Sequence, residues 1–237
     1  MNAPGAPAGA GDPGLPAGAA LLRLLHLVSP ALPVGAYAYS QGLEYAVQAG
    51  WVADEAGSFA WLRGLAWRGL GSLDLPVLLR LQRACARGDE AALQDWNARL
   101  LAARPTAELR AEDRHLGQAL LRILASLEVP GVPAPGAGPA SFALAFALAG
   151  THWRIAERDL LTGYLWSWTE NQVLAAIKLV PLGQSAGQRL LHRLIGELPA
   201  VVARALTLHD EEIGSSAVSQ GLASALHETQ YTRLFRS

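Results

Sequence analysis

Cysteine and lysine are almost absent from this chain. Cys85 is the only cysteine, so no disulfide can form within the chain, and a single thiol without histidine neighbours gives no zinc pattern. This usage is typical of a reducing compartment, and we expect a cytoplasmic location. Lys178 is the only lysine, and residues 174–177 before it read LAAI. The glycines of a phosphate-binding loop are missing there, so we expect no nucleotide hydrolysis by that route.

An excess of charge of either sign is also missing. The chain has 19 Lys+Arg against 20 Asp+Glu, so no overall field favours nucleic acid or an anionic membrane. Two uncharged stretches, residues 24–43 and 129–153, are long enough to cross a bilayer. Both contain prolines, and the second also contains glycines, which a lipid-exposed helix could not hold. We therefore expect neither a nucleic-acid nor a membrane partner.

Two segments lack the composition of regular structure. Residues 1–18 are rich in Ala, Gly and Pro, without the basic start and apolar run of a signal peptide, and we expect a disordered tail. Residues 129–140 read VPGVPAPGAGPA, which predicts a flexible connection. This connection is also a candidate boundary between two helical subbundles.

The rest of the chain has helical periodicity and few β-branched residues, with only five isoleucines among many alanines and leucines,. This pattern predicts an all-α fold, a bundle of about ten helices within residues 19–228. A first helix should cover 19–28 and stop before Pro30. Later helices should begin at capping residues: Ser40, Ser58, Ser72, Asp89 and Thr106. Beyond the connection we expect helices from about 141, over 157–180, over 185–208 and over 217–228.

No metal site can be assigned from the sequence. The six histidines show no His-x-x-x-His spacing and no Cys/His cluster,. The richest acidic cluster, residues 209–212 (HDEE), could hold a divalent ion weakly at a helix end, but a solvated helix junction explains it better.

One motif is typical of a catalytic nucleophile. Residues 183–187 read GQSAG and fit the nucleophile elbow of serine hydrolases, with Asp210 and His227 following in hydrolase order,. The elbow requires a parallel sheet, and the chain offers one candidate strand, residues 177–180. A helix stop followed by a helix capped at Ser185 explains the same residues. A serine hydrolase using Ser185, Asp210 and His227 is therefore kept only as the alternative function.

Two features allow both a structural and a functional interpretation. Helical spacing places Tyr164, Ser167, Asn171 and Lys178 along one polar line of a mostly apolar helix. Lys178 then either stabilises the helix end or presents its charge to a partner protein. The final residues, 227–237, contain Tyr, Phe and Arg, which anchor interfaces, so they either fray or become ordered on a partner.

Three segments, in the same order along the chain, resemble motifs of the UreF family of urease accessory proteins. Residues 24–44 (LLHLVSPALPVGAYAYSQGLE) look like the opening signature of that family. Residues 176–184 (AIKLVPLGQ) resemble its central motif, and residues 227–237 (HETQYTRLFRS) resemble its C-terminal motif. The resemblance covers about residues 20–237. Between roughly residues 80 and 150 it rests on the helical pattern alone.

The resemblance implies a cytoplasmic, all-α homodimer without an active site. A protein of this kind would bind the accessory protein called UreD or UreH, recruit the GTPase UreG, and act with them on apo-urease. It would hold no stable cofactor, because nickel is handled by the assembled complex and GTP is bound by UreG. Its role would be to couple GTP hydrolysis to nickel insertion.

The same resemblance favours partner-binding roles for residues in the matched motifs. Lys178 becomes a candidate contact to a partner, and residues 229–237 become a docking segment that should bury little surface in the free chain. The full set of candidate partner-binding residues is Tyr39, Glu44, Asn171, Lys178, Tyr231, Arg233, Leu234, Phe235 and Arg236.

Overall fold

The computed structural model describes residues 18–134 and 137–237, and its regular secondary structure is helical throughout these ranges, with no strand. The all-α prediction is confirmed. The expected tail, residues 1–18, lies outside the described residues except for Gly18. The α-helices are α1 (Ala19–Leu27), α2 (Leu43–Gln48), α3 (Glu55–Leu65), α4 (Asp74–Arg87), α5 (Glu90–Ala102), α6 (Ala107–Ser126), α7 (Phe142–His152), α8 (Glu157–Leu179), α9 (Gln184–Ile195), α10 (Leu198–Ala205) and α11 (Val218–His227).

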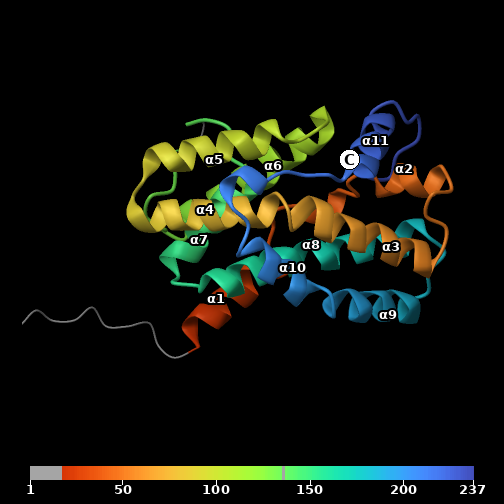
Figure 1. Ribbon diagram of the computed structural model, residues 1–237, viewed down its shortest axis with the longest axis horizontal. Coiled ribbons are helices and arrows are strands. Elements are labelled where there is room, and N and C mark those ends of the chain that lie inside the picture. The colour runs from red at the N-terminus through yellow and green to blue at the C-terminus, as the bar shows by residue number, and fades with distance from the viewer. Residues whose placement is uncertain (1–17, 135–136) are drawn as a thin grey trace, which may run out of the picture.

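Most of the helices run along the long axis of the molecule (Figure 1). The 23-residue α8 contacts α1, α4, α9 and α10, and at 1.5 Å per residue it is about 35 Å long. Helices α5 and α7 pack against α4, while α2 and α11 pair at one end of the molecule. No described helix has both the length and the apolar character needed to cross a membrane.

One hydrophobic core extends across the proline-rich connection. Leu124 of α6 and Phe146 of α7 are both fully buried in the same cluster, so a division into two subbundles at this connection is wrong. The end of the connection is held by Asn97, which donates to the Pro139 carbonyl at 2.8 Å and accepts from the Ser141 amide at 2.9 Å. Proline and glycine exclude helix there, but they do not prevent anchoring by a buried amide side chain.

Three of the expected helix starts are confirmed by their hydrogen bonds. The side chains of Asp89, Thr106 and Ser141 each accept a hydrogen bond from the backbone amide three residues later, as N-cap residues do. Helices α1 and α8 also begin and end within one residue of the expected positions.

Four other serines do not start helices as expected. Asp54 caps α3 in place of Ser58, which lies inside that helix. The hydroxyl of Ser72 donates to the Trp67 carbonyl after a π-helical turn, Ala66–Leu70. Gly42 rather than Ser40 directly precedes α2, although the Ser40 hydroxyl accepts the Glu44 amide of that helix at 3.2 Å and also donates to the Ser237 carbonyl. Ser185 lies in the first turn of α9 without capping it.

The long helix expected over 185–208 is two helices. Helix α9 ends at Ile195 and α10 begins at Leu198, with Pro199 in the first turn of α10. Proline fits the first turn of a helix, where its missing amide proton is not needed, but it interrupts a continuous one. The break lets α10 pack against both α4 and α8.

A buried guanidinium group joins four segments of the bundle. Arg104, between α5 and α6, pairs with Asp74 at the start of α4 and with Asp113 of α6, the latter at 2.9 Å. Asp113 also accepts the Phe142 amide at 2.7 Å and so supports the first turn of α7. All three charged side chains are at most 17% exposed, so each charge depends on its partner for stabilisation.

Candidate functional site

The last seven residues, 231–237, cross the end of the molecule where α2 and α11 meet, and we call them the C-terminal strap. The carbonyl of Ser237 accepts hydrogen bonds from the amides of Ser40 and Gln41 at 2.7 and 3.0 Å, and from the Ser40 hydroxyl at 2.6 Å. The Arg236 amide donates to the Ala38 carbonyl at 2.9 Å. The strap therefore binds the loop that precedes α2 through backbone groups.

Glu44 is the main acceptor for the middle of the strap. Its carboxylate accepts the amides of Leu234 and Phe235 at 2.6 and 2.9 Å, and one oxygen also lies 3.2 Å from the Nε2 atom of His227. His227 is fully buried and lies 2.7 Å from Glu108 through its other ring nitrogen. Arg233 donates to the remaining oxygen of Glu108 at 2.6 Å, so polar and charged side chains of α2, α6, α11 and the strap form one network.

The strap has an inner and an outer set of side chains. Phe235 and Ser237 are 6% and 1% exposed, whereas Tyr231 and Leu234 are 102% and 67% exposed. The expectation that this segment buries little surface in the free chain is therefore wrong for its inner residues. Their acceptor, Glu44, lies about 190 residues away in sequence, which composition and periodicity cannot reveal.

Two further candidate residues lie beside the strap. Lys178 is exposed near the end of α8, and its Nζ atom lies 5.7 Å from the centre of the Phe235 ring, within the range of a cation–π contact. Tyr39 is buried beneath the strap, and its pKa is raised mainly by burial, with the Arg236 side chain acting in the opposite direction. Tyr39, Glu44, Lys178 and the five candidate residues of the strap thus lie in one region of the molecule.

The expected polar line on α8 does not form one exposed face. Tyr164 is 6% exposed and packs against Phe142 and Phe146, while Lys178 is exposed. Asn171 donates to the Ser167 carbonyl of its own helix and lines a cavity, and none of its hydrogen bonds among the described residues goes to the strap. Asn171 is therefore the one candidate that the structure does not bring to the strap.

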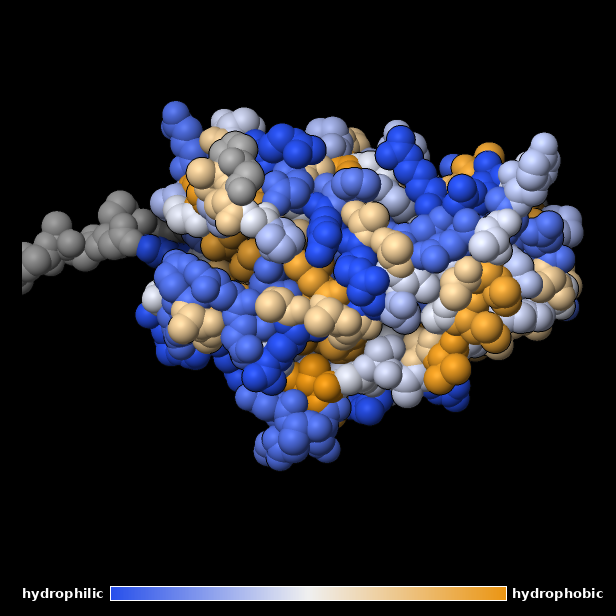
Figure 2. Space-filling model, turned by 90° about the horizontal axis from the view of Figure 1, so that it is seen from above, coloured by the Kyte–Doolittle hydropathy of each residue, from blue (hydrophilic) through white to orange (hydrophobic). Residues whose placement is uncertain are grey.

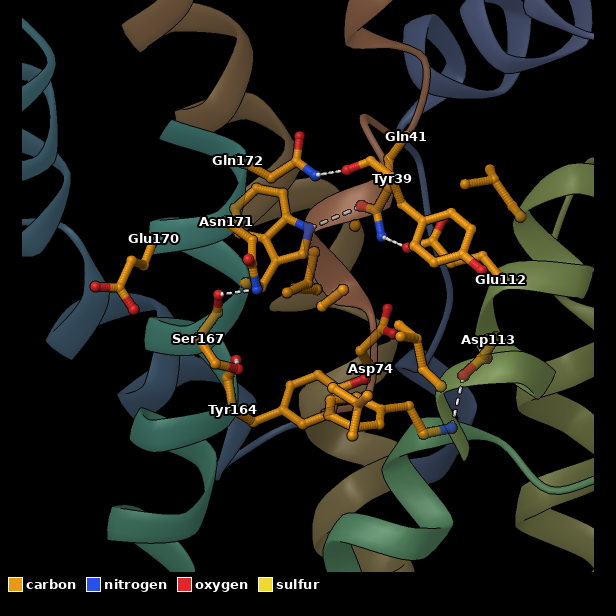
Figure 3. A pocket seen from close by; sticks show the side chains of 18 of the residues that line it. Tyr39, Gln41, Asp74, Glu112, Asp113, Tyr164, Ser167, Glu170, Asn171 and Gln172 are labelled. Atoms are coloured by element: carbon orange, nitrogen blue, oxygen red, sulfur yellow. Dashed lines mark hydrogen bonds between the residues drawn. The ribbon is translucent and has the colours of Figure 1, made fainter. Parts of the chain in front are cut away.

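The cavity lined by Asn171 lies between α4, α6 and α8 and the loop before α2, and it holds about 170 Å³. Its polar side chains converge from these elements (Figure 3). Gln41 connects the cavity to the strap region, because it accepts from the Trp168 indole at 2.8 Å and donates to Glu112 at 2.7 Å. Sequence reasoning missed Gln41 and Glu112, although Gln41 lies within the first matched motif.

Glu112 is the acidic residue under the end of the strap. Its second oxygen accepts the Ser237 hydroxyl at 2.7 Å. Burial raises the pKa of this carboxyl from its ordinary value of 4.5 to about 7, while the hydrogen bonds from Gln41 and Ser237 act to lower it. The folded chain therefore holds a proton on Glu112 at pH values where the unfolded chain has lost it.

We expect the free energy of unfolding to fall as the pH rises from about 4.5 to 7, because the folded pKa of Glu112 lies above the unfolded one,. The fall should be on the order of 3 kcal/mol for this carboxyl. A neutral glutamine cannot titrate, so Glu112→Gln should remove this part of the pH dependence and be more stable than wild type near pH 8. Urea unfolding of both proteins across this range measures the difference; equal slopes would contradict the assignment.

The acidic cluster at 209–212 is a helix junction in the structure. Asp210–Glu212 form a short 3-10 turn, Asp210 pairs with Arg80 at 2.8 Å, and Glu212 accepts the His209 amide at 2.8 Å. Among the described residues, no group of three or more His, Cys, Asp or Glu side chains is placed to hold a metal ion.

The hydrolase interpretation of residues 183–187 is not supported. Ser185 lies in the first turn of α9, which follows α8, and the described residues contain no strand to form the required elbow,. Both ring nitrogens of His227 are engaged by Glu44 and Glu108. Asp210 is paired with Arg80, so the three residues do not form a triad.

Comparison with known proteins gives one consistent result. The UreF family model matches residues 52–195. A protein of Teredinibacter turnerae described as "Urease accessory protein UreF" is 54% identical over 220 residues, covering 92% of this chain and 98% of the relative. Relatives with the same description in Hahella chejuensis and Pseudomonas entomophila are 48% and 50% identical, again covering 92% of this chain and 98% of each relative.

Proposed function

Because this chain belongs to the UreF family, we propose that it is a urease assembly factor that binds UreD (also called UreH) through its C-terminal strap. In this proposal the chain also recruits the GTPase UreG, and the complex couples GTP hydrolysis to the insertion of nickel into apo-urease. The chain itself would act in the cytoplasm as a homodimer.

The observation that carries the proposal is the two-sided strap. Glu44 and Ser40 hold its backbone, and Phe235 is buried, so Tyr231 and Leu234 are displayed from a fixed segment. A tyrosine and a leucine already held in place lose little conformational entropy when a partner covers them. Arg233 is partly exposed beside them, and tyrosine and arginine are enriched among residues that dominate binding energy.

The proposed role is non-enzymatic. The only lysine, Lys178, is at the end of a helix without a glycine-rich loop, so GTP would be bound by UreG alone. We expect the purified chain to hydrolyse neither GTP nor a p-nitrophenyl ester, as measured by phosphate release and by absorbance. Ester turnover that disappears in Ser185→Ala would overturn the assembly-factor proposal.

The direct test is reconstitution with the cognate proteins. Tagged chain should retain purified UreD, and this pair should then retain UreG in a manner that depends on the bound nucleotide. Light scattering should give twice the chain mass for the free protein. Urease activation should require all three proteins; activation that is unchanged without this chain would contradict the proposal.

Lys178→Ala should separate a partner contact from a stabilising one. The side chain is exposed, and its cation–π contact with Phe235 contributes about 0.5–1 kcal/mol at such a site,. We therefore expect a small change in melting temperature and a clear loss of UreG recruitment, measured by co-elution. The control is Arg87→Ala, at the exposed end of α4 and away from the strap; equal recruitment by both variants would remove Lys178 from the interface.

A further inference from the structure

A second surface, separate from the strap, is a groove between α3 and the segment that leads into α11. The groove has a volume of about 650 Å³. Its floor includes Val52 and Leu65, which are almost completely buried, and its rims include Trp51 and Val218, which are 45% and 79% exposed. Large apolar side chains on both rims of a groove are unusual on a surface that only contacts water.

The exposed apolar surface continues from the groove along α11. Leu222 follows Val218 by one helical turn and is 52% exposed. Figure 2 shows one cluster of residues of high hydropathy toward the end of the molecule at which α11 lies, and further such residues nearer the middle. The groove and this face of α11 together form one apolar surface.

Gly64 lines this groove, and no neighbour among the described residues requires a glycine there. It lies inside α3, where glycine costs about 1 kcal/mol of helix stability relative to alanine,. A Cβ atom built at this position would have no atom within 4 Å. By contrast, a Cβ at Gly117 or Gly150 would overlap neighbouring atoms of the chain. The missing side chain at Gly64 therefore leaves space open only toward the groove.

The lining of the groove also contains one charged side chain. Arg68 at the end of the groove is exposed, and its guanidinium forms no ion pair within the described part of the chain. This guanidinium group only donates hydrogen bonds, and no other charged residue is found among the described residues that line the groove,.

We propose that this groove binds an amphipathic helix of a different protein, with an apolar side chain over Gly64 and a carboxylate about one turn away that pairs with Arg68. The floor and rims favour an apolar anchor, and the absence of a side chain at Gly64 lets the helix backbone approach closely. The exposed guanidinium of Arg68 favours an acidic residue on the bound helix,. This surface lies beyond the proposed strap interface and serves a second contact.

The test places a photo-crosslinking amino acid at Val218 of the full-length chain, produced in cells together with the urease proteins, and sequences the attached peptide. We expect a helical segment of another protein with an aspartate or glutamate beside its apolar face. Crosslinking should fall at least about tenfold in Gly64→Leu and in Arg68→Glu. Replacement of the partner carboxylate by lysine should restore it in Arg68→Glu.

Two controls keep folding and nonspecific capture apart from docking. Gly64→Leu fills open space and improves helix propensity,, so its melting temperature should not fall. Ala91→Leu also introduces a leucine, at an exposed position of α5, and should leave crosslinking unchanged. A photo-crosslinker at Leu127, which is 43% exposed at the end of α6, should not capture the same peptide.

The outcomes separate this inference from the proposed function. The groove proposal would be overturned if the crosslinker attached to a second copy of this chain or to a peptide without an acidic residue. An equal crosslinking yield in Gly64→Leu would also overturn it. No attachment above that at Leu127 would also overturn it. An acidic amphipathic helix from a protein unrelated to urease would support the groove and count against the assembly role.

Discussion

Replacing Tyr231 and Leu234 together with alanine should weaken binding of UreD at least thirtyfold while leaving the melting temperature of the free chain unchanged. Both side chains are largely exposed, so they contribute little to the folded state. As central anchors of an interface they would each contribute about 2 kcal/mol, and 2 kcal/mol alone corresponds to about thirtyfold in affinity. Titration calorimetry with purified UreD measures this loss.

The matched control is Phe235→Ala, which changes the inner face of the same strap. Phe235 is buried in an apolar cluster with Leu43 of α2 and Val173 of α8, so its truncation should destabilise the chain by about 3 kcal/mol. Removal of the whole strap is a less informative experiment, because Glu44 and Glu112 would lose hydrogen-bond donors inside the protein,. Unchanged UreD affinity in the double variant would contradict docking through the strap.

Arg104→Met should destabilise the chain more than any exposed substitution, by about 3–5 kcal/mol. The variant leaves Asp74 and Asp113 buried without their shared cation. Methionine can fill the space of the arginine stem, so the loss reflects the unpaired carboxylates rather than a cavity. Chemical denaturation at neutral pH measures the free energy of unfolding.

Arg99→Met provides the comparison for this effect. Arg99 pairs with Asp95 on the same helix, and both side chains are more than half exposed. Surface pairs of this kind contribute about 0.3–0.5 kcal/mol, so this variant should stay close to wild type. If the two variants lost the same stability, the buried ion pairs would not be what joins α4, α6 and α7.

Local chemistry explains which parts of the fold could be predicted. Asp89, Thr106 and Ser141 precede apolar runs and make short-range capping bonds, so their positions determine the helix starts. Ser40 and Ser72 were expected to act in the same way, but the Ser40 hydroxyl donates to the Ser237 carbonyl, 197 residues away, and the Ser72 hydroxyl donates back to the Trp67 carbonyl. The packing of α6 against α7 across the proline-rich connection depends on the shared core, which composition does not describe.

The candidate site was predictable where a motif contained its residues. Tyr39, Glu44, Lys178 and the strap residues come from three separate motifs, and the structure brings them to one surface. The inner and outer faces of the strap could not be separated, because the segment has neither helical nor strand periodicity. Glu112, Glu108 and Gln41 lie between or inside the motifs, and only the fold reveals their contacts with the strap.

The bond between Ser40 and Ser237 has a consequence for the order of events during synthesis. These residues are 197 positions apart, so at about 5–20 residues per second the ribosome needs roughly 10–40 s to make the second after the first. During that interval the loop before α2 has no strap, and Glu44 lacks its amide donors. A nascent chain stalled shortly before residue 231 should therefore expose this region to proteases or chaperones, and the release of the last residues should close it.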